Sequence, residues 1–181
     1  MRRLEIPFLD THNLKEIDKF NQLMDGLQAA AIDCNPWPAY QADAQAKFLI
    51  AHNGDAILLK YIISEQYLVA NEGTNGNIHN DSCVELFIAF GDEGYYNLEF
   101  NCLGFTKIGY GYDRLDRELL PVEVIKQLSF SSKINANSTI NSNEGFDWEI
   151  MLVIPKEIFI KHQISSFHHL NAKGNFYKCG D

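Results

Sequence analysis

Long hydrophobic runs are absent from this sequence, although 46% of its 181 residues are hydrophobic. A helix that spans a membrane needs about 20 consecutive apolar residues. No segment here comes near that length, so we expect no membrane span. The first residues, MRRLEIPFLD, contain two arginines but no apolar stretch after them, and they do not resemble a signal peptide. This predicts a cytoplasmic protein unless a leader has been removed.

Positive charge is also scarce. The chain has 15 lysines and arginines against 24 aspartates and glutamates, which gives a formal net charge of -9. An acidic surface of this kind repels phosphate groups. We therefore do not expect a nucleic-acid partner.

Cysteine is too sparse for a disulfide scaffold. Cys34, Cys83, Cys102 and Cys179 form no C-x-x-C pair, which argues against a zinc site. Free cysteine is among the most buried residue types, so we expect packed thiols. Such thiols suit a reducing compartment.

Segments typical of β-strands fill most of the chain after residue 45. They are separated by turn signals such as Asn53-Gly54. A helical pattern occurs only within residues 11–31, where apolar residues recur at three- and four-residue steps. The polar residues 131–145 are expected to be irregular. We predict one all-β antiparallel sandwich over residues 1–181, with about 1–34 as an N-terminal extension that contains a short helix.

The hairpin NDSCVELFIAFGDEGYYNLEFNCLG, residues 80–104, has a polar side. Side chains alternate across a strand, so residues 84, 86, 88, 96, 98 and 100 can share one apolar face if the turn has an odd length or a bulge. That register brings Glu85 opposite Glu99 or Asn101. The other face, here called the polar face, then consists of Cys83, Glu85, Phe87, Tyr95, Asn97, Glu99 and Asn101.

Two carboxylates on facing strands repel each other unless something lies between them. A cation, a shared proton, an arginine or the hydroxyls of a ligand would each serve. Clustered acids and amides beside aromatic rings suit sugar hydroxyls. An exposed aromatic side chain near Glu85 would support that reading, and a lysine or arginine filling the face would count against it. A merely solvated outer face is the alternative.

The same residues resemble a known family. The segments DSCVELFI and GYYNLEFNCLG, preceded by AKFLIAHNGDAILLKYIISE and followed by WEIMLVIP and GNFYKCGD, are similar in order to carbohydrate-binding family 9-like domains. These are related to the family 9 modules of xylanases. The resemblance covers most of residues 35–181. It implies a jelly-roll-like sandwich that binds the end of a sugar chain of a polysaccharide, has no catalytic residues and carries calcium.

Site residues follow from the resemblance position by position. The sugar-contacting glutamate of the D-S-V-E motif corresponds to Glu85, and an arginine position on the next strand corresponds to Glu99. No tryptophan precedes the motif here, where residues 77–80 read NIHN. We predict a ligand site formed by Glu85, Asn97, Glu99 and Asn101, with Tyr95 as a stacking surface and His79 at the rim.

Other functions remain open at this point. One is a structural or interaction domain that has lost sugar binding. Another is a glycoside hydrolase that uses Glu85 and Glu99, since cross-strand carboxyl groups can reach the separation of about 5–5.5 Å that retaining enzymes need. Calcium is a candidate cofactor with the weak ligand candidates Asp81, Asp92 and Glu93. An open sheet edge would favour a homo-oligomer.

Overall fold

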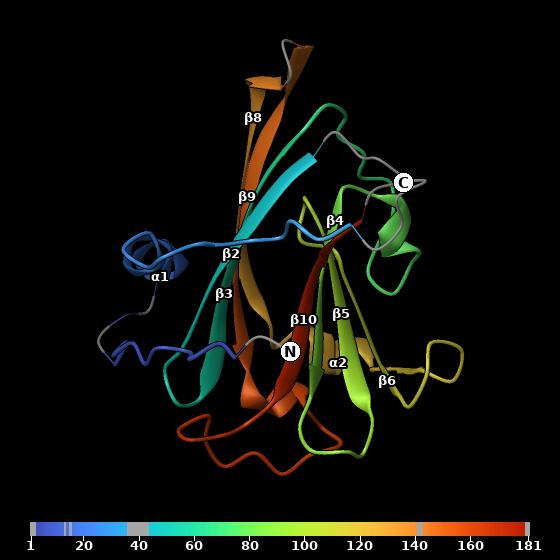
Figure 1. Cartoon of the computed structure of the whole chain (residues 1–181). Helices are drawn as coiled ribbons and strands as arrows, with labels where there is room; N and C mark the ends of the chain where they lie inside the picture. The colour runs from blue at the N-terminus through green and yellow to red at the C-terminus, as the bar shows by residue number, and fades with distance from the viewer. Residues whose placement is uncertain (1–2, 13, 15, 36–43, 141–142, 180–181) are drawn as a thin grey trace.

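Two five-stranded antiparallel sheets pack face to face, which confirms the predicted all-β sandwich (Figure 1). The computed structural model describes residues 3–12, 14, 16–35, 44–140 and 143–179. Sheet A has the order β1 (Ala30–Ala31), β2 (Ala44–His52), β3 (Ala56–Glu65), β9 (Asn143–Pro155) and β8 (Ser129–Ile140). Sheet B has the order β10 (Lys173–Lys178), β4 (Cys83–Ala89), β5 (Tyr95–Asn101), β6 (Thr106–Gly111) and β7 (Glu118–Leu119).

The main core lies between the sheets. Alternate residues of each strand point into it, as the period of two requires. Trp148, Ile150, Leu152 and Ile154, which alternate along β9, are all buried there. The other tryptophan, Trp37, lies outside the described residues.

The hairpin of β4 and β5 has the predicted register. Glu85 pairs with Glu99, and Leu86 pairs with Leu98. The apolar set therefore faces the core, and the polar set faces away from sheet A. The turn between the strands contains two glycines with positive φ, Gly91 at 82° and Gly94 at 101°, which is the left-handed backbone that glycine tolerates best.

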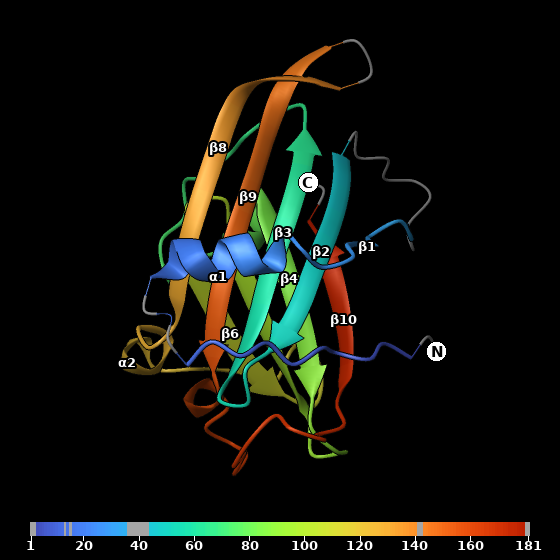
Figure 2. The ribbon, with the colours of Figure 1, turned by 90° about the vertical axis from the view of Figure 1, so that its left-hand side faces the viewer.

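Helix α1 (Ile17–Met24) lies across the outer face of sheet A (Figure 2). Its apolar side packs on Leu58 and Met151 in a second small core. Lys60 is buried beside it and pairs with Asp25 at 2.6 Å and with Glu149 at 2.9 Å. Lys60 therefore does not reach the carboxylates of the polar face, because β3 belongs to the other sheet.

The other helices are short. They are α2 (Val122–Ile125) and the 3-10 turns η1 (Ile78–Asn80) and η2 (Lys156–Ile158). Within the described residues, no helix is long and apolar enough to cross a membrane.

The expectation of an irregular segment at 131–145 is wrong. Most of it belongs to β8 and β9, which form a long hairpin with one irregularity between Asn135 and Ser138. Polar side chains suit this hairpin where it is exposed on one side. Lys133, for example, is mostly exposed and lies 3.5 Å from Glu149 on the facing strand.

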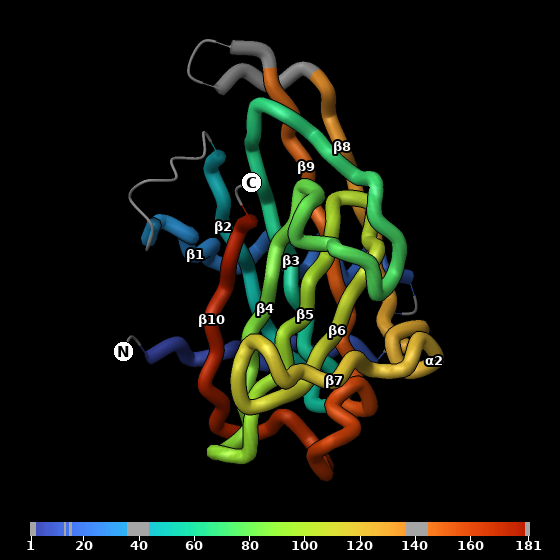
Figure 3. Tube along the Cα trace, turned by 90° about the vertical axis from the view of Figure 1, so that its right-hand side faces the viewer, coloured from blue at the N-terminus to red at the C-terminus, as the bar shows by residue number. Residues whose placement is uncertain are grey.

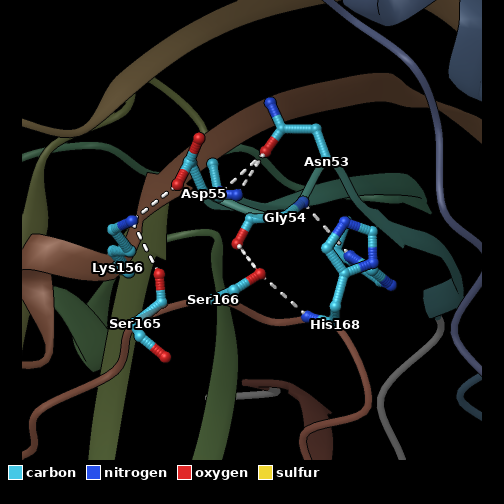
Figure 4. A network of polar contacts seen from close by, with 9 residues as sticks. Asn53, Gly54, Asp55, Lys156, Ser165, Ser166 and His168 are labelled. Atoms are coloured by element: carbon cyan, nitrogen blue, oxygen red, sulfur yellow. Dashed lines mark hydrogen bonds and ion pairs between the residues drawn. The ribbon is translucent and has the colours of Figure 1, made fainter.

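The turn between β2 and β3 anchors the segment after β9 (Figure 4). Asn53 Oδ1 accepts hydrogen bonds from the backbone N–H groups of Asp55 and Ala56, which confirms the turn predicted from Asn53-Gly54. The Gly54 carbonyl accepts a hydrogen bond from Ser166 Oγ at 3.1 Å. This end of the sandwich is thereby closed by polar contacts.

We expect His52 to make this end of the sandwich sensitive to acid. Its Nδ1 accepts a hydrogen bond from the Gly54 N–H at 3.2 Å. Burial, and then the nearby His168 and His169, lower the pKa of His52 from 6.5. A lowered histidine pKa means that the unfolded chain takes up the proton more readily than the folded one. His52 therefore lowers the stability of the fold as the pH drops below about 6.5, and it has no effect on stability above that pH.

Melting curves at pH 5.5 and 7.5 should differ less for His52→Asn than for the wild type. The exposed His12→Asn variant should keep the wild-type difference.

Candidate functional site on the outer face of sheet B

The polar face lies on the outside of sheet B, away from α1 (Figure 3). Residues 66–82 arch over one end of the strands, where η1 contacts β4 and β5. Residues 112–117 cross the other part of the face on their way from β6 to β7. The strand β10 pairs with the free edge of β4 and brings Tyr177 beside Glu85. Three separate parts of the chain thus frame the hairpin.

Glu85, Asn97 and Glu99 lie together at the centre of this face. Asn97 Nδ2 donates to Glu85 Oε2 at 2.7 Å. In the described part of the chain, neither carboxylate forms an ion pair with a lysine or arginine. The two acids are therefore adjacent, and the positive charges of Lys107, opposite Glu99 on β6, and of Arg117 act on Glu99 without forming an ion pair with it.

Glu99 is unusual because it is both buried and unsatisfied. Its exposed fraction is 5%, and its Oε2 has no hydrogen-bond partner among the residues that the structure describes. Burial first, and then the charge of Glu85, raise the pKa of Glu99 above its ordinary value. His79 Nδ1 lies 3.9 Å from that oxygen, too far for a hydrogen bond. A buried acceptor without a hydrogen-bond partner costs free energy.

Arg117 is a site residue that the sequence analysis missed. Its guanidinium donates to Asn97 Oδ1 and lies 5.9 Å from the centre of the Tyr95 ring. It approaches so closely because Gly109 and Gly111 have no side chains on this face of β6. These glycines belong to a strand and do not form turns or bulges. Arg117 covers part of the polar face, which counts against sugar binding by the criterion given above, but it forms no ion pair with Glu85 or Glu99.

Gly111→Ala should displace this arginine. An added Cβ would lie 2.6 Å from Asp116 Oδ1 and 2.9 Å from Arg117 Cα, so residues 112–117 would have to move. We expect a loss of about 2 kcal/mol, as for other overpacked sites, or roughly 4–8 °C in Tm, measured by thermal unfolding. Gly174→Ala in β10 is the matched control, because its Cβ would meet only the Phe87 carbonyl oxygen at 3.5 Å. An equal fall in Tm in both variants would contradict the close approach of Arg117 to β6.

Three half-buried aromatic rings line the β10 side of the face. Phe87 contacts Tyr95 with a ring-centre distance of 6.1 Å and Tyr177 with 5.5 Å. Tyr95 was predicted as a stacking surface. Tyr177 was not, since only the pairing of β10 with β4 brings it next to Glu85.

Asn101 and Asp81 serve the fold. Asn101 is fully buried, donates to Asp81 Oδ2 at 2.9 Å and accepts from the N–H groups of Leu103 and Phe105. Asp81 also accepts from the N–H of Asn71 and the N–H of Glu72. These contacts hold residues 66–82 in place. They also occupy the Asn101 amide and the Asp81 carboxylate, which a ligand would otherwise contact.

The three candidate calcium ligands do not come together. Asp81 precedes β4, whereas Asp92 and Glu93 lie in the turn after it, roughly 20 Å away along a strand of this length. Asp92 instead pairs with Lys173 at 2.7 Å.

Two of the cysteines meet at the edge of the polar face. Cys179 N–H donates to the Cys83 carbonyl at 2.9 Å, and its thiol donates to Glu85 Oε1 at 3.0 Å. Hydrogen bonding with Cys83, burial and the charge of Glu85 raise the pKa of the Cys179 thiol far above its usual range. The sequence shows no sign of this cluster, because residues 83 and 179 are distant along the chain.

A cavity of about 290 Å³ lies elsewhere, at the end of the sandwich beyond β4. Polar side chains line part of it, namely His162, Gln163, Ser165, Ser166 and Asn171. Among the described residues that line it there is no lysine, arginine or carboxylate, so it lacks the clustered acids of the polar face.

Comparisons with known proteins agree with the resemblance seen in the sequence. A model described as carbohydrate-binding family 9 matches residues 18–181. A structure from Bacteroides uniformis ATCC 8492, described as that of a candidate carbohydrate-binding protein, is 32% identical, with a TM-score of 0.85 over 98% of this chain and 84% of that one. A family 9 module from Caldicellulosiruptor kristjanssonii in complex with glucose is 9% identical, with a TM-score of 0.49 over 97% of this chain and 76% of that one. No curated protein matches. The match to the family model over most of the chain shows that this protein belongs to carbohydrate-binding family 9.

Proposed function

We propose that this protein is a non-catalytic module that binds a carbohydrate on the polar face. The observation that carries the proposal is the pair Glu85 and Glu99, two adjacent carboxylates without a lysine or arginine partner among the described residues. The hydroxyls of a sugar are neutral donors and can bridge such carboxylates without adding charge.

The surroundings of the pair suit a sugar. Arg117 is a fixed donor, and Glu85 accepts from Asn97 while keeping room for further hydrogen bonds. Tyr177 and Tyr95 offer half-buried rings on which the apolar side of a sugar ring can lie. His79 is partly exposed at the rim, and rotation of its side chain would open access to Glu99. Asn101 is left out of the proposed site, since its amide is already satisfied.

Hydrolysis is disfavoured by the placement of the two carboxylates. A glycosidase needs two carboxyl groups that flank the scissile bond, but Glu99 lies directly beside Glu85 on one face of sheet B. Binding needs only that the pair accept hydrogen bonds from one side.

Isothermal titration calorimetry against a panel of mono- and oligosaccharides tests the proposal. We expect Glu85→Ala to weaken the binding of the recognised sugar at least about tenfold, because a charged acceptor is lost. Asp92→Ala, in the turn of the same hairpin, is the control and should bind as the wild type does. Absence of heat with every sugar, or equal binding by Glu85→Ala, would favour a structural domain that has lost sugar binding.

A further inference from the structure

The cluster of Cys83, Glu85 and Cys179 has the make-up of a metal site. Its three ligand atoms, two sulfurs and one carboxylate oxygen, lie within 4.8 Å of one another. Both cysteines are free. Thiolates prefer Zn²⁺ among common divalent cations, whereas Ca²⁺ and Mg²⁺ prefer oxygen ligands.

The backbone explains why these atoms converge. Cys83 and Glu85 are two residues apart on β4 and therefore point to the same face. Cys179 continues the register of β10 and lies across from Cys83, to whose carbonyl its N–H donates at 2.9 Å. The ligands thus sit on two hydrogen-bonded strands, and a metal would not require the strands to move.

The distances are near those of a tetrahedral zinc site. With Zn–S bonds of about 2.3 Å, two thiolates on one zinc ion lie roughly 3.8 Å apart. The three ligand atoms lie within 4.8 Å of one another, and rotation of the side chains alone can shorten these distances to the values of a zinc site. Cys83 is fully buried, but Glu85 and Cys179 are half-buried, so water can occupy a fourth position.

The carboxylate is already oriented for this role. Glu85 Oε1 faces the Cys179 thiol, and Oε2 accepts from Asn97 at 2.7 Å. A metal on Oε1 would replace the thiol proton and keep the bond to Asn97, in the way that ligating carboxylates are commonly held by a neighbouring donor.

We propose that Cys83, Glu85 and Cys179 bind one Zn²⁺ ion at the edge of the polar face, with a water molecule as the fourth ligand. The site stands beside the proposed sugar site and shares Glu85 with it. It needs no sugar, so a failure to bind sugar and a failure to bind metal are distinguishable.

Co²⁺ and Zn²⁺ binding to the purified, reduced protein tests the proposal. With Co²⁺ we expect one ion per chain and a thiolate-to-metal charge-transfer band that Zn²⁺ displaces and Ca²⁺ does not. Cys179→Ser should remove the band and weaken Zn²⁺ binding at least about a hundredfold, more than the loss of a supporting contact does. Cys34→Ser, at an exposed cysteine, should keep both.

A measurement on the wild type covers the case in which a variant fails to fold. Zn²⁺ should slow the reaction of Cys179, the half-buried thiol of the pair, with a thiol reagent under native conditions, while the exposed Cys34 reacts as before. A Co²⁺ spectrum without the charge-transfer band, a Cys179 thiol that reacts equally fast with and without Zn²⁺, or loss of metal in Cys34→Ser would overturn the proposal.

Discussion

Glu99→Gln should make the protein more stable and weaken its binding of sugar. The raised pKa of Glu99 means that the folded state favours the neutral carboxyl, so its ionisation costs stability above about pH 4.5, and this cost persists at neutral pH. Glutamine has the same shape and no charge. We expect a gain of about 1 kcal/mol at pH 7, or roughly 2–4 °C in Tm. Sugar affinity should fall about tenfold with the loss of a charged acceptor.

Opposite changes in stability and affinity distinguish a ligand-binding carboxylate from a structural one. Substituting a residue that stabilises the fold would make the protein less stable, whereas substituting a residue that is present for a ligand makes the protein more stable. Differential scanning calorimetry at pH 7 and at pH 4 provides an internal control, since the gain should shrink when the wild-type carboxyl is protonated. A lower Tm at pH 7 would show that Glu99 stabilises the fold and would remove it from the proposed site.

Glu65→Ala should cause a large loss of stability. The Glu65 carboxylate joins the two sheets: its Oε1 accepts from Trp148 Nε1 at 2.6 Å, and its Oε2 pairs with Lys178 Nζ at 2.8 Å. Both partners are at least nine-tenths buried. Alanine would leave a buried ammonium and a buried indole N–H without this acceptor. We expect a cost of about 3 kcal/mol, or roughly 6–12 °C in Tm, measured by chemical and thermal unfolding.

The same change should reach the polar face through β10. Lys178 is adjacent to Tyr177 and Cys179, and this strand is held further by Phe176, whose ring stacks on Phe48 with a centre-to-centre distance of 3.7 Å. Glu65→Gln keeps a hydrogen-bond acceptor for the Trp148 indole and should lower Tm less than Glu65→Ala does. Glu123→Ala, which breaks only an exposed pair with Lys126, should leave Tm unchanged. If Glu65→Ala lowered Tm no more than Glu123→Ala does, the contacts of Glu65 would not hold the two sheets together.

The hairpin of the polar face could be predicted because local pattern decides it. An odd-length turn or a bulge is needed to place Leu86 and Leu98 on the same side. This left Glu85 opposite Glu99 or Asn101, and the structure pairs it with Glu99. The family could be recognised from the same stretch. Long-range placement could not: nothing near Lys60 in the sequence indicates that α1 covers it and supplies Asp25.

The missed parts of the site come from distant segments. Tyr177 and Cys179 reach Glu85 only because β10 pairs with β4. Arg117 reaches Asn97 because the glycines of β6 let residues 112–117 run close to the sheet. Asn101 was predicted as a ligand residue because the alternation of side chains shows which face of the sheet a residue lies on. It does not show which groups that residue contacts, and the Asn101 amide donates to Asp81.

The most direct test of sugar binding on the polar face is an amide chemical-shift titration of the labelled wild-type protein with the sugar found by calorimetry. We predict that the largest shifts fall on Glu85, Asn97, Glu99, Arg117 and Tyr177, and that residues around the cavity near His162 stay unchanged. Shifts concentrated at that cavity, with the polar face unaffected, would contradict the account.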